Sequence, residues 1–168
     1  MKVLFLDIDG VLNSTKTCVA FGGYPMELHH IEAFDKAAIR LIQRLCDSAG
    51  VQVVLSSAWR LHHDFKDVGK ALDLPIIDRT PSLLGPRGLE INAWLSNHPE
   101  VEAFAIIDDD SDMLPDQLPR FVQTNNREGL TWGDFEKLCA LFGESAYSGE
   151  PRERDWQKGA GVALAWES

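Results

Sequence analysis

Residues 3–13 read VLFLDIDGVLN, an apolar run that is followed at once by two acids and a glycine. The run 3–6 predicts a strand that is buried on both faces, because a strand with one wet face would alternate apolar and polar residues. Asp7 and Asp9 then stand where a parallel strand ends, and Gly10 permits a tight turn that brings the backbone close to a ligand. A solvated acidic turn is the plainer interpretation of this segment taken alone.

Apolar runs and helical patterns alternate along the rest of the chain, as they do in parallel α/β proteins. Further strands are expected at residues 51–55, 75–77, 104–107 and 121–122. Helices are expected from the N-cap Asp35 to Gly50, over 65–72, over 89–95, and from the N-cap Thr131 to Phe142. The pattern predicts a three-layer, Rossmann-like α/β fold in which helices cover both faces of a parallel sheet.

The length of 168 residues is typical of a single domain. We expect this domain to span residues 1–143. Residues 144–168 are rich in Gly, Ser, Pro and charge, and they predict a loosely held C-terminal tail. Trp156 and Trp166 leave open whether this tail packs back onto the domain.

The chain is acidic, with 16 Lys and Arg against 26 Asp and Glu and a net charge of −10. This balance argues against broad electrostatic capture of nucleic acid or of an anionic membrane, although a local basic groove is compatible with it. The three cysteines lack the spacing of a zinc ribbon or a disulfide scaffold. No apolar run reaches the length of a signal peptide core or a membrane span, so we expect a cytoplasmic protein with no membrane partner, its oligomeric state left open.

Two further segments place phosphate-binding groups at a strand end and a helix start. Residues 51–60 read VQVVLSSAWR, in which the hydroxyls of Ser56 and Ser57 and the amides after them can hold a phosphate oxygen. Capping of the next helix is the competing role for these serines. Arg87 is expected at the start of a helix, where the helix dipole does not stabilise a cation. We therefore expect its guanidinium to neutralise a negatively charged group in the ligand crevice at the sheet edge. A solvated Arg is the alternative.

Four acids follow the strand at 104–107, namely Asp108, Asp109, Asp110 and Asp112. Their mutual repulsion costs stability unless a cation offsets it or the loop is fully open to water. Hard oxygen ligands of this kind suit Mg²⁺, which usually retains waters and bridges to a substrate phosphate. The acidic segment therefore predicts a magnesium site.

In this order the four segments resemble the four motifs of the haloacid dehalogenase (HAD) superfamily, whose members transfer phosphoryl groups through an aspartate nucleophile. Asp7 and Asp9 match the first motif, Ser56 the second, Arg87 the third, and Asp108 with Asp109 the fourth. The chain is similar in sequence to the HAD domain of Swiss Army Knife RNA repair proteins. The segments that carry this similarity are LDIDGVLN, VVLSSAWR, RGLEINAWL and IIDDDSDM.

The resemblance implies a phosphomonoester hydrolase with an aspartyl-phosphate intermediate, in which Asp7 is the nucleophile and Asp9 the general acid and base. It implies that Asp7, the backbone carbonyl of Asp9, and Asp108 or Asp109 hold Mg²⁺. The phosphate oxygens would be bound by Ser56, Ser57, Arg87 and Gly10. The superfamily usually has Lys in the third motif, so Arg127 and Lys70 stay alternatives to Arg87, and Asp112 stays an alternative metal ligand.

Superfamily members often carry a cap domain over the site, but residues 14–34 and 61–84 are too short to form one. A minimal or absent cap suits a large substrate such as an RNA or DNA end. Trp59 and Arg60, beside His62 and His63, are candidates for stacking and phosphate contacts, although a capping Trp and solvated histidines are plainer interpretations. Two alternative functions stay open: a nucleotide or other small-molecule monophosphatase, and a non-catalytic metal-binding regulatory module.

Overall fold

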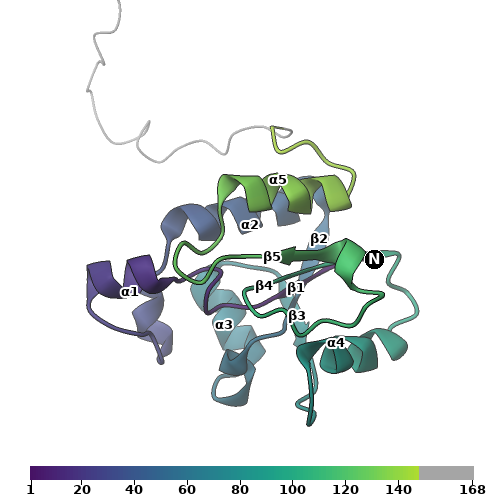
Figure 1. The fold of residues 1–168 in the computed structure, drawn as a ribbon, viewed down its shortest axis with the longest axis horizontal. Helices are drawn as coiled ribbons and strands as arrows, with labels where there is room; N and C mark the ends of the chain where they lie inside the picture. The colour runs from purple at the N-terminus through teal and green to yellow at the C-terminus, as the bar shows by residue number, and fades with distance from the viewer. Residues whose placement is uncertain (148–168) are drawn as a thin grey trace, which may run out of the picture.

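Five parallel strands form one sheet in the computed structural model, which describes residues 1–147 (Figure 1). They are β1 (Lys2–Leu6), β2 (Val51–Leu55), β3 (Ile76–Arg79), β4 (Ala103–Asp108) and β5 (Phe121–Gln123). The order across the sheet is β3-β2-β1-β4-β5, which puts the first strand at the centre. The predicted strands are confirmed, with β3 ending two residues later than expected.

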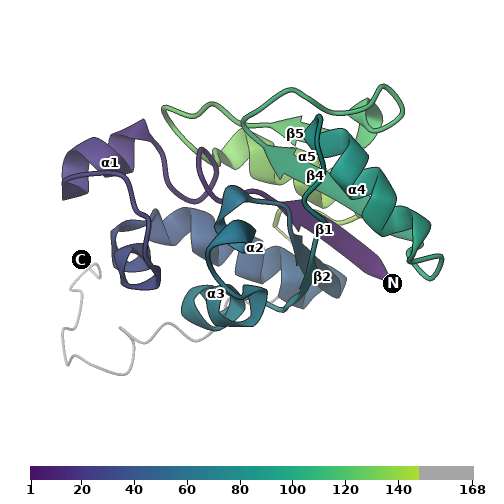
Figure 2. The ribbon, with the colours of Figure 1, turned by 90° about the horizontal axis from the view of Figure 1, so that it is seen from below.

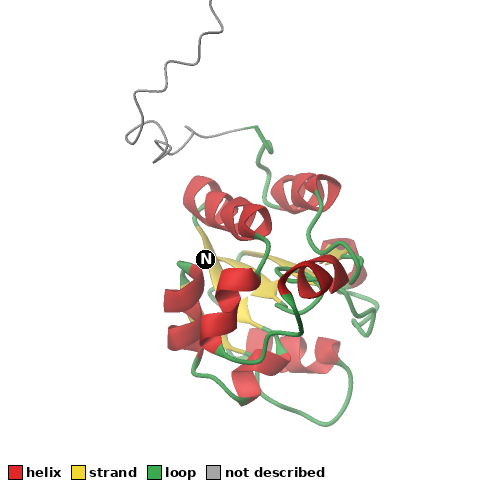
Figure 3. Cartoon of the chain, turned by 90° about the vertical axis from the view of Figure 1, so that its left-hand side faces the viewer, coloured by secondary structure: helices red, strands yellow, loops and turns green. Residues whose placement is uncertain are grey.

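Helices cover both faces of this sheet, as the views from the front and the side show (Figures 1 and 3). The α-helices are α1 (Thr15–Phe21), α2 (Lys36–Ala49), α3 (Phe65–Leu72), α4 (Arg87–Ser96) and α5 (Trp132–Leu141). Short 3₁₀ helices are η1 (Leu28–Ala33), η2 (Ala58–Leu61) and η3 (Leu118–Arg120). The helices α2 and α5 pack on one face and α4 on the other, while α3 lies along β3. The predicted three-layer fold is confirmed.

Local capping explains where most helices begin. Asp35 accepts hydrogen bonds from the amides of Ala37 and Ala38, and Thr131 forms a reciprocal capping box with Asp134, as predicted. Helix α1 was not expected, because residues 14–34 lack a clear helical period. It begins at a capping box that Ser14 makes with a threonine instead of the usual Glu or Gln, and it lasts only seven residues.

Alternate residues of β1 supply two separate parts of the core. Leu4 and Leu6 belong to the large cluster beneath α2 and α5. Val3 and Phe5 belong to a smaller cluster beneath α4, where Trp94 meets the Phe5 ring edge-on at 5.4 Å between centroids. Because both faces are covered, β1 is buried from Val3 onward, which is why its sequence does not alternate.

The register of the strands aligns the residues that follow them. Leu6 pairs with Leu55 of β2 and with Ile107 of β4. The next residues along the chain, Asp7, Ser56 and Asp108, therefore lie at the same level, at the carboxyl edge of the sheet. Helix α1 lies beyond this carboxyl edge in both ribbon views (Figures 1 and 2).

Most of the predicted tail, including Trp156 and Trp166, falls outside the described residues. Within 144–147, the ring of Tyr147 lies 5.4 Å from that of Trp132 between centroids. None of the helices described between residues 1 and 147 has the length and apolar character needed to cross a bilayer.

A buried ion pair ties the layer of α4 to the sheet. The guanidinium of Arg60, just after β2, binds the carboxylate of Glu90 on α4, and both side chains are less than 10% exposed. Arg60 also donates to the carbonyls of Ser57 and Thr80, at 2.6 and 3.1 Å. Glu90 accepts the amide of Leu83 at 3.0 Å. The pair thus holds the segments after β2 and β3 against α4.

We expect Glu90→Gln to lower the free energy of unfolding by about 3–5 kcal/mol, because it leaves the Arg60 charge buried without its partner. The double variant Arg60→Met/Glu90→Met removes both charges and is expected to lose less. Urea unfolding of the two variants measures the difference. An unchanged unfolding midpoint for Glu90→Gln would contradict a structural role for the pair.

Candidate active site

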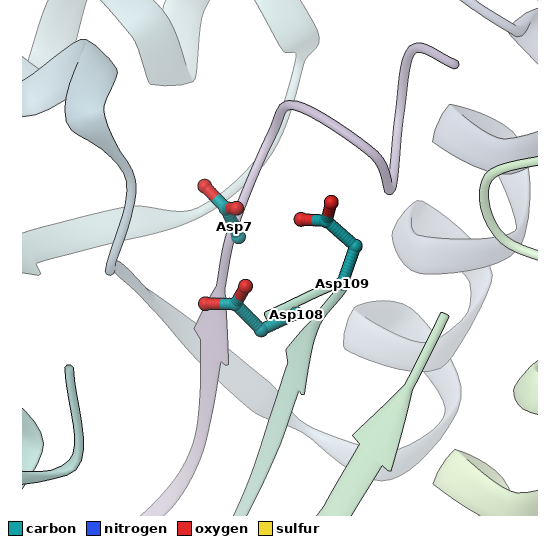
Figure 4. Close-up of side chains that lie close together, drawn as sticks. All are labelled: Asp7, Asp108 and Asp109. Atoms are coloured by element: carbon teal, nitrogen blue, oxygen red, sulfur yellow. The ribbon is translucent and has the colours of Figure 1, made fainter. Parts of the chain in front are cut away.

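Three carboxylates gather at the carboxyl ends of the neighbouring strands β1 and β4 (Figure 4). One oxygen from each of Asp7, Asp108 and Asp109 lies within 4.8 Å of the other two. Asp7 and Asp108 are buried, and Asp109 is half-buried. The amide of Ile8 donates to Asp7 Oδ1 at 2.8 Å and the amide of Asp110 to Asp108 Oδ1 at 3.0 Å, so backbone bonds fix two of the three side chains.

Arg87, the first residue of α4, faces two of these carboxylates. Its Nη1 lies 3.8 Å from Asp7 Oδ1, and its Nε lies 3.7 Å from Asp108 Oδ2. Both distances exceed a hydrogen bond. Arg87 Nη1 and Asp108 Oδ2 are accordingly buried without a hydrogen-bond partner. Such atoms are rare in folded proteins, and a bound ligand group is one way to satisfy them.

The other candidate cations do not join the cluster. Lys70 on α3 and Arg127 before α5 are both exposed, and neither forms an ion pair with an acid among residues 1–147. Of the three cations weighed from the sequence, Arg87 is therefore the one that the fold brings to the carboxylates.

Asp112, the third acid considered as a metal ligand, has a different set of contacts. Its carboxylate accepts the Arg87 amide at 2.8 Å, and its carbonyl accepts the Gly88 amide at 3.2 Å. It therefore caps the start of α4 from a neighbouring loop. Gln117 donates to the Gly88 carbonyl at 2.9 Å, and a Cβ at Gly88 would lie 2.5 Å from the Leu114 amide nitrogen. This tight loop contact fixes the helix end that carries Arg87.

The two serines after β2 have different surroundings. Ser57 hydrogen-bonds through its side chain to Asp7, and its hydroxyl also accepts the Trp59 amide at 3.4 Å as the cap of η2. Ser56 is 1% exposed, and its hydroxyl has no hydrogen-bond partner. Ser56 therefore has a free hydroxyl to offer a ligand, whereas Ser57 orients Asp7.

Asp9 is exposed, and two side chains hold its carboxylate. Asn13 Nδ2 donates to Asp9 Oδ1 at 2.7 Å. Trp59 Nε1 lies 3.2 and 3.1 Å from Asp9 Oδ1 and Oδ2. The sequence did not single out Asn13, although its place four residues after Asp9 in the same turn is the signal that would have found it. The side chain of Asp9 thus stands beside the three-carboxylate cluster and outside it.

Gly10 shapes the turn that separates Asp7 from Asp9. Its φ of +78° is in the left-handed region, and a Cβ there would lie 2.4 Å from Asp109 Cγ. Its amide donates to Asn13 Oδ1 at 3.1 Å, and its carbonyl accepts the Thr124 hydroxyl at 2.7 Å. The amide that was expected to bind phosphate is thus bonded within the turn, and Gly10 serves here to let Asp109 approach.

The predicted substrate contacts of Trp59 and Arg60 are corrected by their burial. Trp59 is 4% exposed, with its ring against Phe34 and its N–H on Asp9, so it presents no open face to a base. Arg60 is 5% exposed, and its guanidinium is occupied by Glu90 and by backbone carbonyls. Both residues support the site instead. The nearby His63 contacts the Met26 carbonyl at 2.8 Å.

Comparison with known families places this geometry in context. The family model described as the HAD domain in Swiss Army Knife RNA repair proteins matches residues 3–135. The chain belongs to this family. The matched range contains every residue of the site, from Asp7 to Asp109, so the resemblance seen in the sequence is confirmed. No curated protein and no solved structure matches the chain.

The three carboxyl groups at this site of the HAD domain have raised pKa values. Burial raises the pKa of Asp7 to about 6, and the nearby Arg87 and the hydrogen bond from Ser57 only partly oppose that rise. Burial, with the charge of Asp7 added, raises the pKa of Asp108 to about 8. Burial and Asp110 also raise the pKa of Asp109. Ionising all three carboxyls beside one guanidinium is therefore unfavourable without a further cation.

The donor set fits a divalent metal, which HAD domains generally use. Three carboxylates within 4.8 Å of one another supply hard oxygen ligands, and Asp108 Oδ2 is buried with no other partner. A cation among them would offset the repulsion that raises their pKa values. Asp7, Asp108 and Asp109 are the residues that would hold it.

We expect the stability of the HAD domain in EDTA to fall as the pH rises from 5 to 8.5. Asp7 and Asp108 have folded-state pKa values of about 6 and about 8, above the ordinary value of 3.8. The folded state therefore binds more protons than the unfolded state in this window, and its advantage is lost as the pH rises through those values. Melting temperatures across the window measure the effect.

In Asp108→Asn this decline should be smaller, and the melting temperature at pH 8 in EDTA should be higher. Millimolar Mg²⁺ should raise the melting temperature of the unaltered protein, and more so at high pH, because it binds ionised ligands. Asp116→Asn, at an exposed position in the loop after β4 and outside the cluster, is the matched control. Identical melting curves in Mg²⁺ and in EDTA at pH 8 would argue against a metal site.

Proposed function

We propose that this HAD domain is a Mg²⁺-dependent phosphomonoester hydrolase that acts on the phosphorylated end of an RNA or DNA strand. The observation that carries the proposal is the setting of Asp7. Its carboxylate lies close to the Arg87 guanidinium and to the carboxylates of Asp108 and Asp109, at the level where Ser56, whose hydroxyl has no partner, follows β2. A nucleophile, an anion-binding pair and metal ligands thus meet at one edge of the sheet.

In the first step, a carboxylate oxygen of Asp7 attacks phosphorus, and the bond from phosphorus to the leaving oxygen breaks. Asp9 donates a proton to that leaving oxygen. Ser56 and Arg87 donate hydrogen bonds to the oxygens of the phosphoryl group that do not leave. Asp7, Asp108 and Asp109 would hold Mg²⁺, which would neutralise part of the charge of the nucleophile and the phosphate.

In the second step, Asp9 takes a proton from water, and the water oxygen attacks the phosphorus of the aspartyl-phosphate. The bond between Asp7 and phosphorus breaks, which releases inorganic phosphate and restores the carboxylate. Asn13 and Trp59 hold Asp9 through both steps, since both donate to its carboxylate. Their contribution is to keep the Asp9 carboxyl group, the proton donor, in one orientation.

The form of the site supports a large substrate. Residues 14–34 fold as α1 and η1, with a short turn between them, and no inserted domain stands among residues 1–147. A small substrate would gain from a cap that excludes water, whereas a strand end has to enter from outside. The family name, which refers to RNA repair proteins, points the same way.

A substrate panel tests the proposal, with 3′- and 5′-phosphorylated oligonucleotides, free nucleotides, sugar phosphates and p-nitrophenyl phosphate, each in Mg²⁺. We expect kcat/KM to be highest for one class of oligonucleotide. Equal or higher values for free nucleotides would favour the small-molecule monophosphatase. Failure to hydrolyse any of these substrates would favour the regulatory module.

We expect Asp7→Asn to reduce phosphate release from p-nitrophenyl phosphate to background, because the amide is a poor nucleophile. Asp9→Asn should cost about 10²–10⁴-fold in kcat, the usual value of a general acid–base. Asp116→Asn serves as the control and should retain activity. A higher melting temperature of Asp7→Asn in EDTA would show that the variant is folded, and undiminished turnover would exclude the mechanism.

Trp59→Phe is expected to lower kcat by about 10- to 150-fold, because it removes one hydrogen bond to a charged group, worth about 1.5–3 kcal/mol, while keeping a ring against Phe34. Trp132→Phe, on the half-exposed face of α5, is the matched control and should have no effect. Steady-state kinetics with p-nitrophenyl phosphate compare the two. Unchanged kcat in Trp59→Phe would exclude a positioning role.

A further inference from the structure

A cavity opens at the carboxyl end of β3, which is two strands away from β1 and its Asp7. Its volume is about 250 Å³, and it is lined by Arg60, Leu61, Arg79, Thr80, Pro81 and Ser82. None of these residues has a role in the chemistry proposed for Asp7. The chemistry at Asp7 therefore does not account for this cavity.

Thr80 is the most informative of the residues that line this cavity. Thr80 is 2% exposed, and its Oγ1 has no hydrogen-bond partner. The other unpartnered buried side-chain atoms among the described residues are Ser56 Oγ, Arg87 Nη1 and Asp108 Oδ2. Those three belong to the proposed phosphate and metal site. A buried hydroxyl without a hydrogen-bond partner is unfavourable, so Thr80 Oγ1 is a fourth atom whose hydrogen bond a ligand could supply.

The strand register puts Thr80 in line with the nucleophile. Arg79 pairs with Leu55, which in turn pairs with Leu6. Thr80, Ser56 and Asp7 are therefore the next residues on three adjacent strands. Because neighbouring strands lie about 4.8 Å apart, Thr80 and Asp7 are separated by about 10 Å along the edge of the sheet.

Arg79 supplies a positive charge to the same cavity. It is exposed, and it forms no ion pair with an acid in the described part of the chain. One of its five N–H donors binds the Arg60 carbonyl at 2.8 Å, which leaves the others for a ligand. The charge of Arg60 is balanced by Glu90, and the neighbouring Asp78 accepts from Trp94 at 2.7 Å. A hydroxyl and an uncompensated guanidinium together favour an anion.

We propose that this cavity binds an internal phosphodiester of the nucleic-acid strand whose terminal phosphate lies at Asp7. The proposal rests on the proposed function and names a second contact for the same substrate. A nucleic-acid strand carries one phosphate per about 3.4 Å of helix rise. A phosphodiester about 10 Å from the terminal phosphate therefore belongs to the first few nucleotides. A mononucleotide has no second phosphate, so the cavity would distinguish strand ends from small phosphomonoesters.

The net charge of −10 makes this inference testable, because the field of the whole chain disfavours a polyanion. Any preference for a charged linkage must then come from a local contact. The probes are a trinucleotide with a terminal phosphate, at the end that the domain hydrolyses, and the same trinucleotide with uncharged methylphosphonate linkages. The third probe is p-nitrophenyl phosphate, which reports on the chemistry at Asp7 alone.

We expect kcat/KM to be at least about tenfold higher for the charged trinucleotide than for the uncharged one, which corresponds to about 1.4 kcal/mol. Thr80→Val and Arg79→Met should bring this ratio close to one and leave turnover of p-nitrophenyl phosphate unchanged. Thr80→Ser keeps the hydroxyl and should keep the ratio. Lys2→Met removes a cation at the opposite end of β1 and should also keep it.

Thr80→Val should also not lower the melting temperature, because it removes a hydroxyl that has no partner within the protein. A ratio of one in the unaltered protein, with p-nitrophenyl phosphate still hydrolysed, would overturn the cavity's role and leave the proposed function standing. Loss of p-nitrophenyl phosphate turnover in Thr80→Val would overturn it as well. An unaltered protein that hydrolyses none of the three probes would overturn the proposed function itself.

Discussion

Buried negative charge at the carboxyl edge of the sheet is the constraint that connects this fold to its chemistry. The register of β1 and β4 brings Asp7 and Asp108 to the same level, and Gly10 lets Asp109 come close to them. Burial, with the charges of neighbouring acids added, raises the pKa values of all three acids. Ionising such a cluster without a cation is unfavourable, and in the proposed function a divalent cation would allow the anionic nucleophile to approach a phosphate.

The surrounding structure serves to hold this arrangement. Asp112 caps α4 and Gln117 binds its first turn, so that Arg87 is fixed opposite the carboxylates. The buried pair of Arg60 and Glu90 joins α4 to the segments after β2 and β3. Positions that look like solvent-facing polar residues in the sequence are thus internal supports, and the site's precision depends on contacts between distant segments.

Much of the fold could be predicted because its signals are local. The unbroken apolar run at residues 3–6 indicated a strand buried on both faces, and the caps at Asp35 and Thr131 marked helix starts. Helix α1 was missed, since a helix of seven residues is too short to show a period and its capping box uses a threonine. The order of motifs along the chain also indicated which strand ends would carry the site.

The roles of individual side chains were harder to predict, because they depend on which distant groups they meet. Trp59 and Arg60 were expected to contact substrate, yet their partners are Asp9 and Glu90, which lie far away in the sequence. The choice of Arg87 among three cations and the capping by Asp112 likewise follow from tertiary contacts. Thr80 carries no sequence signal, and only its burial without a partner draws attention to it.

In the proposed mechanism Asp7 itself becomes phosphorylated, and acid-quench mass spectrometry detects this phosphorylation directly. The protein is mixed with substrate and Mg²⁺, quenched in acid within a turnover, digested and analysed by peptide mass. We expect the peptide containing Asp7 to gain the mass of one phosphoryl group, more so in Asp9→Asn, where hydrolysis of the aspartyl-phosphate is slowed. Turnover with no phosphoryl group on that peptide, or with one on another residue, would contradict it.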